Sequence, residues 1–97
     1  MTAPDPEVAA GIARTLVSER LAACGNVIPG LTSIYRWEGV VQEDPEALLV
    51  LKTRRERVAA LIRRIGELHP YDVPEVLSLP VEEGLPAYLS WVESEAS

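Results

Sequence analysis

The sequence has little of the residue types that carry most protein chemistry. Its 97 residues contain one cysteine, one histidine, one lysine and no phenylalanine. A lone cysteine forms no disulfide within the chain, which excludes the small secreted scaffolds that disulfides hold together. There is also no run of about eighteen apolar residues and no secretory signal pattern at the N-terminus. We therefore expect a cytoplasmic protein with no membrane partner.

Positive charge is scarce as well. Nine lysines and arginines face fifteen acidic residues, and the formal net charge is −6 at pH 7. This balance repels the phosphate backbone, so nucleic acid is not expected as a partner. The arginines between residues 54 and 64 fall in a segment with helical spacing, which is typical of a solvated helix face.

The composition and length predict one folded domain, residues 1–97. The chain is 47% hydrophobic and 25% charged, which is ordinary for a globular protein. A chain of this size builds one core, because two cores would each be too small to be stable.

The first half of the chain predicts a helix followed by a long hairpin. Asp5-Pro6 has the form of an N-cap and first helical position, and apolar spacing continues the helix to about Leu21. Two stretches rich in apolar, β-branched or aromatic residues, 24–28 and 32–41, predict one long strand, bent at Pro29-Gly30.

A polar reversal is expected at residues 42–45, followed by the apolar strand 47–51. The two strands would form a hairpin that is buried on both faces.

The second half of the chain predicts helix, strand and helix. Residues 53–56 have the form of a capping box, and the helix they start should end at His69-Pro70. A short strand is expected at residues 76–79, and a closing helix after Gly84.

The predicted order is that of an α+β fold, a ferredoxin-like split βαββαβ sandwich with an extra C-terminal helix. The first strand is largely missing, since only Met1 and Thr2 precede the Ala3-Pro4 break. We expect that the true start of the protein lies upstream, or that another chain fills the gap.

Three segments together resemble the CutA divalent-cation-tolerance family. They are Arg20-Leu-Ala-Ala-Cys24, Ser33-Ile-Tyr-Arg-Trp-Glu-Gly39 and Leu68-His-Pro-Tyr-Asp-Val-Pro-Glu75. Lys52-Thr53 and Tyr88-Leu-Ser-Trp91 also match. The resemblance implies a ferredoxin-like homotrimer linked to tolerance of copper and other divalent cations, with no established catalysis. The exposed apolar strand around Ile34 independently favours pairing between subunits.

Metal binding is therefore one hypothesis, with copper or another divalent cation as the partner. His69 is the first candidate ligand, because imidazole binds copper, zinc and nickel. The alternative is a residue that ends a helix and bonds a nearby carbonyl. The resemblance places a cysteine and two histidines at the copper site, where this chain has Met1, Leu68 and His69.

Cys24 is the second candidate ligand, since its soft sulfur suits Cu(I). The alternative is a small buried hydrophobe in an apolar segment. A nucleophilic pair of Cys24 and His69, oriented by Glu75, is the only arrangement that would favour an enzyme, and we expect none.

Five further residues are expected at strand ends and could form one cleft or an inter-subunit network. They are Tyr35, Trp37, Lys52, Tyr71 and Glu75. As a cleft, the lysine and the phenols would offer donors to an anionic small molecule. As a network, Lys52 would pair with Glu75. The second functional hypothesis is accordingly a trimeric small-molecule-binding signalling protein, which rests on fold analogy.

Overall fold

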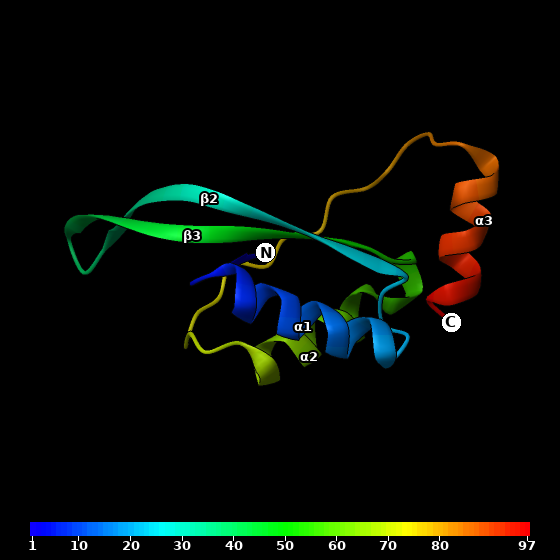
Figure 1. Ribbon diagram of the computed structural model, residues 1–97, viewed down its shortest axis with the longest axis horizontal. Helices are drawn as coiled ribbons and strands as arrows, with labels where there is room; N and C mark the ends of the chain where they lie inside the picture. Colours follow the sequence, from blue (N-terminus) through cyan, green and yellow to red (C-terminus); the bar gives the residue numbers. More distant parts are fainter.

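A central three-stranded sheet organises the structure, a computed structural model that describes residues 1–97 (Figure 1). The fold is α+β, with an antiparallel sheet and three helices. The elements are β1 (Thr2–Ala3), α1 (Pro6–Ser18), β2 (Cys24–Trp37), β3 (Val40–Lys52), α2 (Val58–Leu68) and α3 (Pro86–Glu95). A short 3₁₀ turn, Arg55–Arg57, precedes α2. No helix has the length and apolar character needed to cross a membrane.

The sheet order is β1-β3-β2, with β3 at the centre. The chain reverses between β2 and β3 at Glu38-Gly39, where both residues have positive φ, 49° and 79°. Two such residues form the tight turn that suits a hairpin. The predicted reversal at residues 42–45 is wrong, because Gln42 pairs with Tyr35 and Pro45 with Thr32 inside the hairpin. The outer part of β3 has a free edge, which tolerates a proline.

The predicted bend in the long strand is confirmed. The β2–β3 register shifts between Ile28 and Leu31, and Gly30 has a φ of 82°. A bulge of this kind bends the strand and increases its twist. The bulge divides the β2–β3 hairpin into an inner part, next to the helices, and an outer part, which extends beyond them (Figure 1).

Helix α1 begins where the sequence predicts and ends earlier. The Asp5 carboxylate accepts a hydrogen bond from the Val8 backbone N–H at 2.8 Å, as an N-cap does. The helix ends at Ser18 and not at Leu21, because Arg20 takes a left-handed conformation with a φ of 62°. That conformation cannot continue a right-handed helix.

Helix α2 lacks the predicted capping box. The Thr53 hydroxyl donates to the Leu21 carbonyl at 2.7 Å, so it does not cap the helix. The predicted stop is confirmed, since α2 ends at Leu68 and His69 is extended before Pro70.

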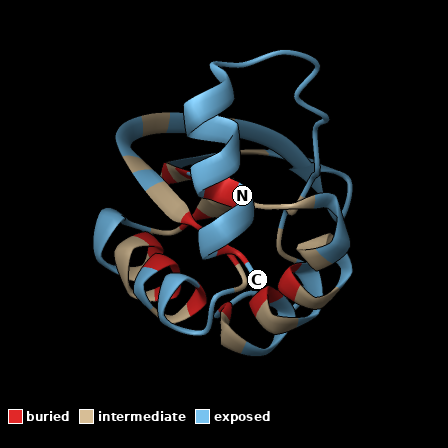
Figure 2. Ribbon diagram, turned by 90° about the vertical axis from the view of Figure 1, so that its right-hand side faces the viewer, coloured by how far each residue is buried: buried red, intermediate tan, exposed pale blue.

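The core lies between the sheet and helices α1 and α2 (Figures 1 and 2). Side chains alternate along a strand, so Ala47 and Leu49 of β3 face the helices and are fully buried. Val50, next in the chain, is 39% exposed on the other face. The prediction of a hairpin buried on both faces is therefore wrong. The core residues are Ala3, Ala9, Ile12, Ala13, Leu16, Ala22, Ala47, Leu49, Leu61 and Ile65.

The predicted strand at residues 76–79 is also wrong. The segment between α2 and α3 has no regular structure, and Leu77 and Leu79 are 76% and 84% exposed. A strand at residues 76–79 would need to pair with a strand of similar length. The first strand, β1, has only two residues. The first strand is thus as short as the sequence predicts.

The predicted closing helix is confirmed as α3, which lies apart from the main core (Figure 1). Val92 and Ala96 pack on Ala23 in a small separate cluster. The Arg20 guanidinium donates to the backbone carbonyls of Ser94 and Ser97, each at 2.8 Å. A few contacts therefore hold this helix at the end of the sheet.

Candidate functional site

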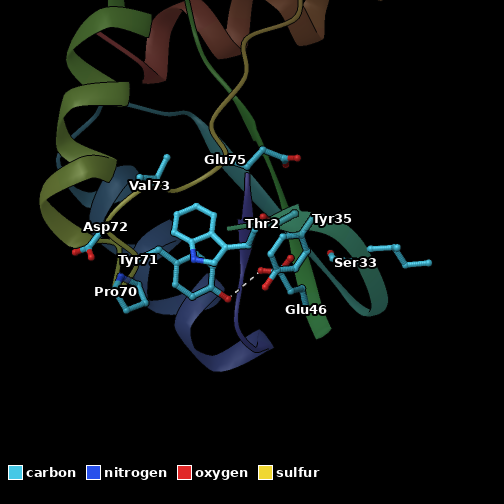
Figure 3. A pocket seen from close by; sticks show the side chains of 11 residues that line it. Thr2, Ser33, Tyr35, Glu46, Pro70, Tyr71, Asp72, Val73 and Glu75 are labelled. Carbon is cyan, nitrogen blue, oxygen red and sulfur yellow. Dashed lines mark hydrogen bonds between the residues drawn. The ribbon is translucent and has the colours of Figure 1, made fainter. Parts of the chain in front are cut away.

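The main cavity has a volume of about 660 Å³ and lies between the β2–β3 hairpin and residues 70–75 (Figure 3). Its size is that of a typical small-molecule site. Its walls combine aromatic rings, carboxylates and four hydroxyls, two of them phenolic. The lining residues are Thr2, Ser33, Ile34, Tyr35, Trp37, Glu46, Pro70, Tyr71, Asp72, Val73 and Glu75.

The hairpin register brings one wall of the cavity together. Ser33, Tyr35 and Trp37 alternate along β2 and so share one face. Tyr35 pairs with Gln42 and Ser33 with Asp44, which places Asp44 and Glu46 of β3 on the same face. The Tyr35 hydroxyl accordingly donates to the Asp44 carboxylate. Because Glu46 alternates with the buried Ala47, this is the face that helices α1 and α2 leave open.

The opposite wall is fixed by Tyr71. Its hydroxyl donates to the Glu46 carboxylate at 2.9 Å, so it reaches across to the hairpin (Figure 3). Its backbone N–H donates to Nδ1 of His69 at 3.1 Å. The His69 and Tyr71 rings also lie with their centroids 4.7 Å apart, tilted by 55°. Tyr71 is therefore held by its hydroxyl, its ring and its backbone N–H.

His69 sits behind this wall and not in the cavity. It is 7% exposed, and its Nε2 lies 2.8 Å from the Thr2 carbonyl. A carbonyl only accepts, so Nε2 carries the proton and Nδ1 is the acceptor for Tyr71. Both ring nitrogens thus have partners, which join α2, β1 and the following segment. To bind a metal, the ring would first have to release one of them.

Negative charge surrounds the phenols. Burial, the hydrogen bond to Glu46 and the nearby carboxylates raise the pKa of Tyr71 to about 12. The hydrogen bond to Asp44 and the neighbouring carboxylates likewise raise the pKa of Tyr35 above its usual value. Both hydroxyls therefore stay protonated at neutral pH and donate to carboxylates.

Two cavity carboxylates have no partner of their own. Asp72 and Glu75 form no hydrogen bond or salt bridge with any side chain of the protein. In Figure 3 Glu75 lies beyond the rings on the side opposite Glu46, with its carboxylate directed to the side, and Asp72 points away from the rings. Burial lowers the pKa of the Met1 ammonium, and the charge of nearby Glu75 partly opposes this shift. Glu75 thus has a positive charge in its vicinity but forms no hydrogen bond.

The structure brings together four of the five residues expected in a cleft: Tyr35, Trp37, Tyr71 and Glu75 all line the cavity. Lys52 does not. It is at the far end of β3, opposite Cys24, and its ammonium donates to the Asn26 side chain. The expected pair of Lys52 with Glu75 does not form within the chain.

Cys24 is also remote from the cavity. It is half-buried, and its Sγ lies 3.3 Å from the Tyr88 hydroxyl of α3. This contact raises the pKa of Tyr88. Cys24 pairs with Lys52 in the sheet, whereas His69 contacts Thr2, which pairs with Leu48. Their contacts with the sheet are thus four residues, about 13 Å, apart along β3, so the fold does not bring Cys24 and His69 together as a nucleophile and its base.

Sequence reasoning missed two of the three lining carboxylates, Glu46 and Asp72, and the two aliphatic hydroxyls, Thr2 and Ser33. The period-two spacing of Ser33, Tyr35 and Trp37 would have found Ser33. Glu46 needed the register of the hairpin, which the misplaced turn concealed. No group of three or more histidine, cysteine, aspartate or glutamate side chains is arranged to hold a metal ion.

Comparison with known proteins identifies the family. The model of the CutA1 divalent ion tolerance protein family matches residues 1–95. The chain belongs to this family. A solved family structure, the divalent cation tolerance protein from Thermus thermophilus, is 52% identical with a TM-score of 0.96, covering 99% of this chain and 93% of that one.

Longer relatives share the same region. Protein CutA homolog of Xenopus laevis is 54% identical over 92 residues, 95% of this chain and 61% of that protein. The chain thus spans less than two thirds of that relative's length. The structure of a PII-like protein CutA from Nostoc sp. PCC 7120 has a TM-score of 0.91 and 38% identity, covering 99% of this chain and 92% of that one. Relatives are named as tolerance proteins, not as enzymes.

The family corrects the expectation of a cytoplasmic protein. A relative from Arabidopsis thaliana that is 44% identical is named chloroplastic. A relative of known structure from Archaeoglobus fulgidus, 34% identical with a TM-score of 0.95, is named a periplasmic protein. Membership therefore does not fix a cytoplasmic location, and the prediction is wrong. Its basis, the absence of a signal pattern, carries no such information for this family.

Proposed function

We propose that the chain acts in divalent-cation tolerance by binding a cation, without catalysis. The carrying observation is the cavity beside the hairpin, whose charged lining residues, Glu46, Asp72 and Glu75, are all acidic. Carboxylate oxygens are ligands for divalent cations. Glu75 is the first choice because it lines the cavity and forms no hydrogen bond or salt bridge.

His69 and Cys24 remain candidate ligands for copper, but each would have to lose an existing hydrogen bond to bind the metal. His69 would give up the Thr2 carbonyl or the Tyr71 N–H. Cys24 would give up Tyr88. The naming of relatives as tolerance proteins and not as enzymes supports a role without catalysis.

Calorimetric titration with Cu(I), Cu(II) and Zn²⁺ tests this function. We expect saturable binding that weakens in Glu75→Gln, while Glu93→Gln, an acid outside the cavity lining, binds like the wild type. Weakening in His69→Ala or Cys24→Ser would assign those residues. The proposal fails if no metal binds saturably, or if all four variants bind the metal with the same affinity as the wild type.

We further propose that the chain is a homotrimer with a ferredoxin-like build in each subunit. The outer hairpin supports this, since Ile34, Trp37, Val40 and Val41 are 66%, 52%, 57% and 59% exposed. So does the segment after the cavity, whose Leu77, Leu79, Val81 and Leu85 are at least 72% exposed. Such apolar surfaces and free strand edges are covered in stable proteins.

Sedimentation measures the trimer directly. We expect trimeric mass for the wild type and a smaller species for Val41→Asp, which places a charge on the outer hairpin. The control is Ile62→Asp, an equally apolar exposed side chain on α2. A monomeric wild type would overturn the proposal.

A second function has its own support. Four residues predicted to share a cleft do line one cavity of small-molecule size, and a structural neighbour is named a PII-like protein. We propose that this cavity also binds a small organic ligand. Its class follows from the cavity's chemistry.

A further inference from the structure

The charges and donors of the cavity argue against an anionic ligand. Its three charged lining residues are Glu46, Asp72 and Glu75, and Lys52 lies elsewhere. A phenol has one O–H to donate. Tyr71 donates to Glu46 and Tyr35 to Asp44, so neither has a donor left for a ligand. Thr2, Ser33 and the Trp37 indole still offer donors, but these are neutral, so no lining side chain supplies a positive charge for an anion.

The same contacts favour a positively charged ligand. Burial is the main cause of the raised pKa of Tyr71, and the carboxylates of Glu46 and Asp44 raise it further because they oppose the formation of tyrosinate there. The lining carboxylates make the local field negative. A cation entering this field is attracted by it. Glu75 lines the cavity without a hydrogen bond or salt bridge. It already interacts at longer range with one cation, the Met1 ammonium, so this carboxylate is in a position to meet an incoming positive charge.

Aromatic walls distinguish an organic cation from a bare metal ion. Tyr35, Trp37 and Tyr71 all line the cavity, and Ile34, Pro70 and Val73 add apolar surface. Ring faces attract ammonium groups, and proteins recognise such ligands between aromatic rings. A hydrated metal ion would leave this apolar surface without a role, whereas an organic body would cover it.

We propose that the cavity binds an organic ammonium ion, with its charged head at Glu75 and its apolar body among Tyr35, Trp37 and Tyr71. The inference rests on the second proposed function, since it names the ligand class of the same cavity. The hold on Tyr71 by Glu46 and His69 supports it, because a wall fixed in advance loses little freedom on binding.

Three probes of one size separate charge from shape. Phenethylammonium, 2-phenylethanol and phenylacetate are titrated into the chelator-treated full chain and followed by calorimetry. We expect the ammonium to bind saturably, the alcohol about tenfold more weakly, and the carboxylate not at all. Equal binding of ammonium and alcohol would overturn the proposal, as would no saturable binding of the ammonium.

Variants then locate the site. Glu75→Gln and Trp37→Leu should each weaken phenethylammonium by about tenfold. Lys52→Met, at the far end of the sheet, should bind like the wild type, and full affinity in both cavity variants would refute the site. Sedimentation of Trp37→Leu checks that the assembly is unchanged; where it is altered, Tyr71→Leu takes its place.

Zn²⁺ binding tests the metal hypothesis independently of the organic-cation proposal. Zn²⁺ needs the carboxylate and not the rings, so it should still bind Trp37→Leu. Loss of phenethylammonium with Zn²⁺ retained supports an organic-cation site beside a metal site. Zn²⁺ binding without any ammonium binding rejects this inference and leaves the first function intact.

Discussion

The two faces of the sheet differ in chemistry as well as in burial. On β3, Leu49 faces the helices and is 1% exposed, while its neighbour Val50 is 39% exposed on the open face. The covered face is aliphatic and packs against α1 and α2. The open face holds aromatic rings, hydroxyls and carboxylates around a cavity. Folding free energy thus comes mainly from one face, and the other is available for ligands or for further copies of the chain.

Substitution of adjacent residues on β3 gives the largest expected difference. Leu49→Ala should lower the free energy of unfolding by about 2–5 kcal/mol, because it leaves a cavity in the core. Val50→Ala should lower it by about 1 kcal/mol or less in dilute protein. Urea denaturation at several protein concentrations measures both. Equal losses at the lowest concentration would mean that the open face is also part of the core of a single chain.

Substitution of His69, which contacts both Thr2 and Tyr71, should have the next largest effect on the free energy of unfolding. His69→Ala leaves the Thr2 carbonyl and the Tyr71 N–H without their partner, at about 1–3 kcal/mol for a buried polar group. The expected loss of stability is present in metal-free protein. His69→Gln, whose amide can donate toward Thr2, should recover part of it. Unchanged stability of metal-free His69→Ala would favour a ligand role instead.

Tyr71 makes the open face sensitive to alkali. Its pKa is about 12 in the folded protein against 10.0 for an ordinary tyrosine. A raised pKa means that the neutral phenol stabilises the fold fully below about pH 10 and that this stabilisation is lost as pH rises toward 12. Spectrophotometric titration of the wild type minus Tyr71→Phe should show this late tyrosine. Glu46→Gln should lower its pKa, and a Tyr71 that titrates normally would contradict the geometry.

The smallest expected effect lies outside both faces. The Arg64 guanidinium makes two hydrogen bonds of 2.9 Å to the Glu19 carboxylate, linking α2 to α1 on the surface. Exposed pairs of this kind contribute little, and salt screens them. Arg64→Gln should therefore change stability least in this series, and high salt should remove the difference. A salt-independent loss would show that the side chain contributes packing.

Local signals predicted the helices, while the pairing of strands needed the whole chain. Asp5 and Pro70 act on their own neighbours, so the start of α1 and the end of α2 were predicted correctly. The hairpin turn was misplaced because Pro45 and three polar residues resemble a reversal. Glu38-Gly39 was overlooked, although its glycine suits positive φ. The strand expected at residues 76–79 fails because its apolar residues have no neighbouring strand within the chain.

The candidate site was predictable in its residues and not in its charge. Tyr35, Trp37, Tyr71 and Glu75 were chosen because polar-tipped residues near strand ends often converge, and they do line one cavity. Lys52 was grouped with them on the same reasoning, but the strand carries it to the opposite end. Only the register shows that Glu46 meets Tyr71. The sequence left open a cleft for an anion or an inter-subunit network, and the acidic lining of the cavity is the reason for proposing a cation instead.

The contact between His69 and Thr2 also bears on the order of folding. It joins residues 67 positions apart in the chain, whereas the β2–β3 hairpin closes over a turn of two residues. Closing a long loop costs more entropy than closing a short one, so distant contacts tend to form after local ones. We therefore expect His69 substitutions to accelerate unfolding and to leave the refolding rate almost unchanged.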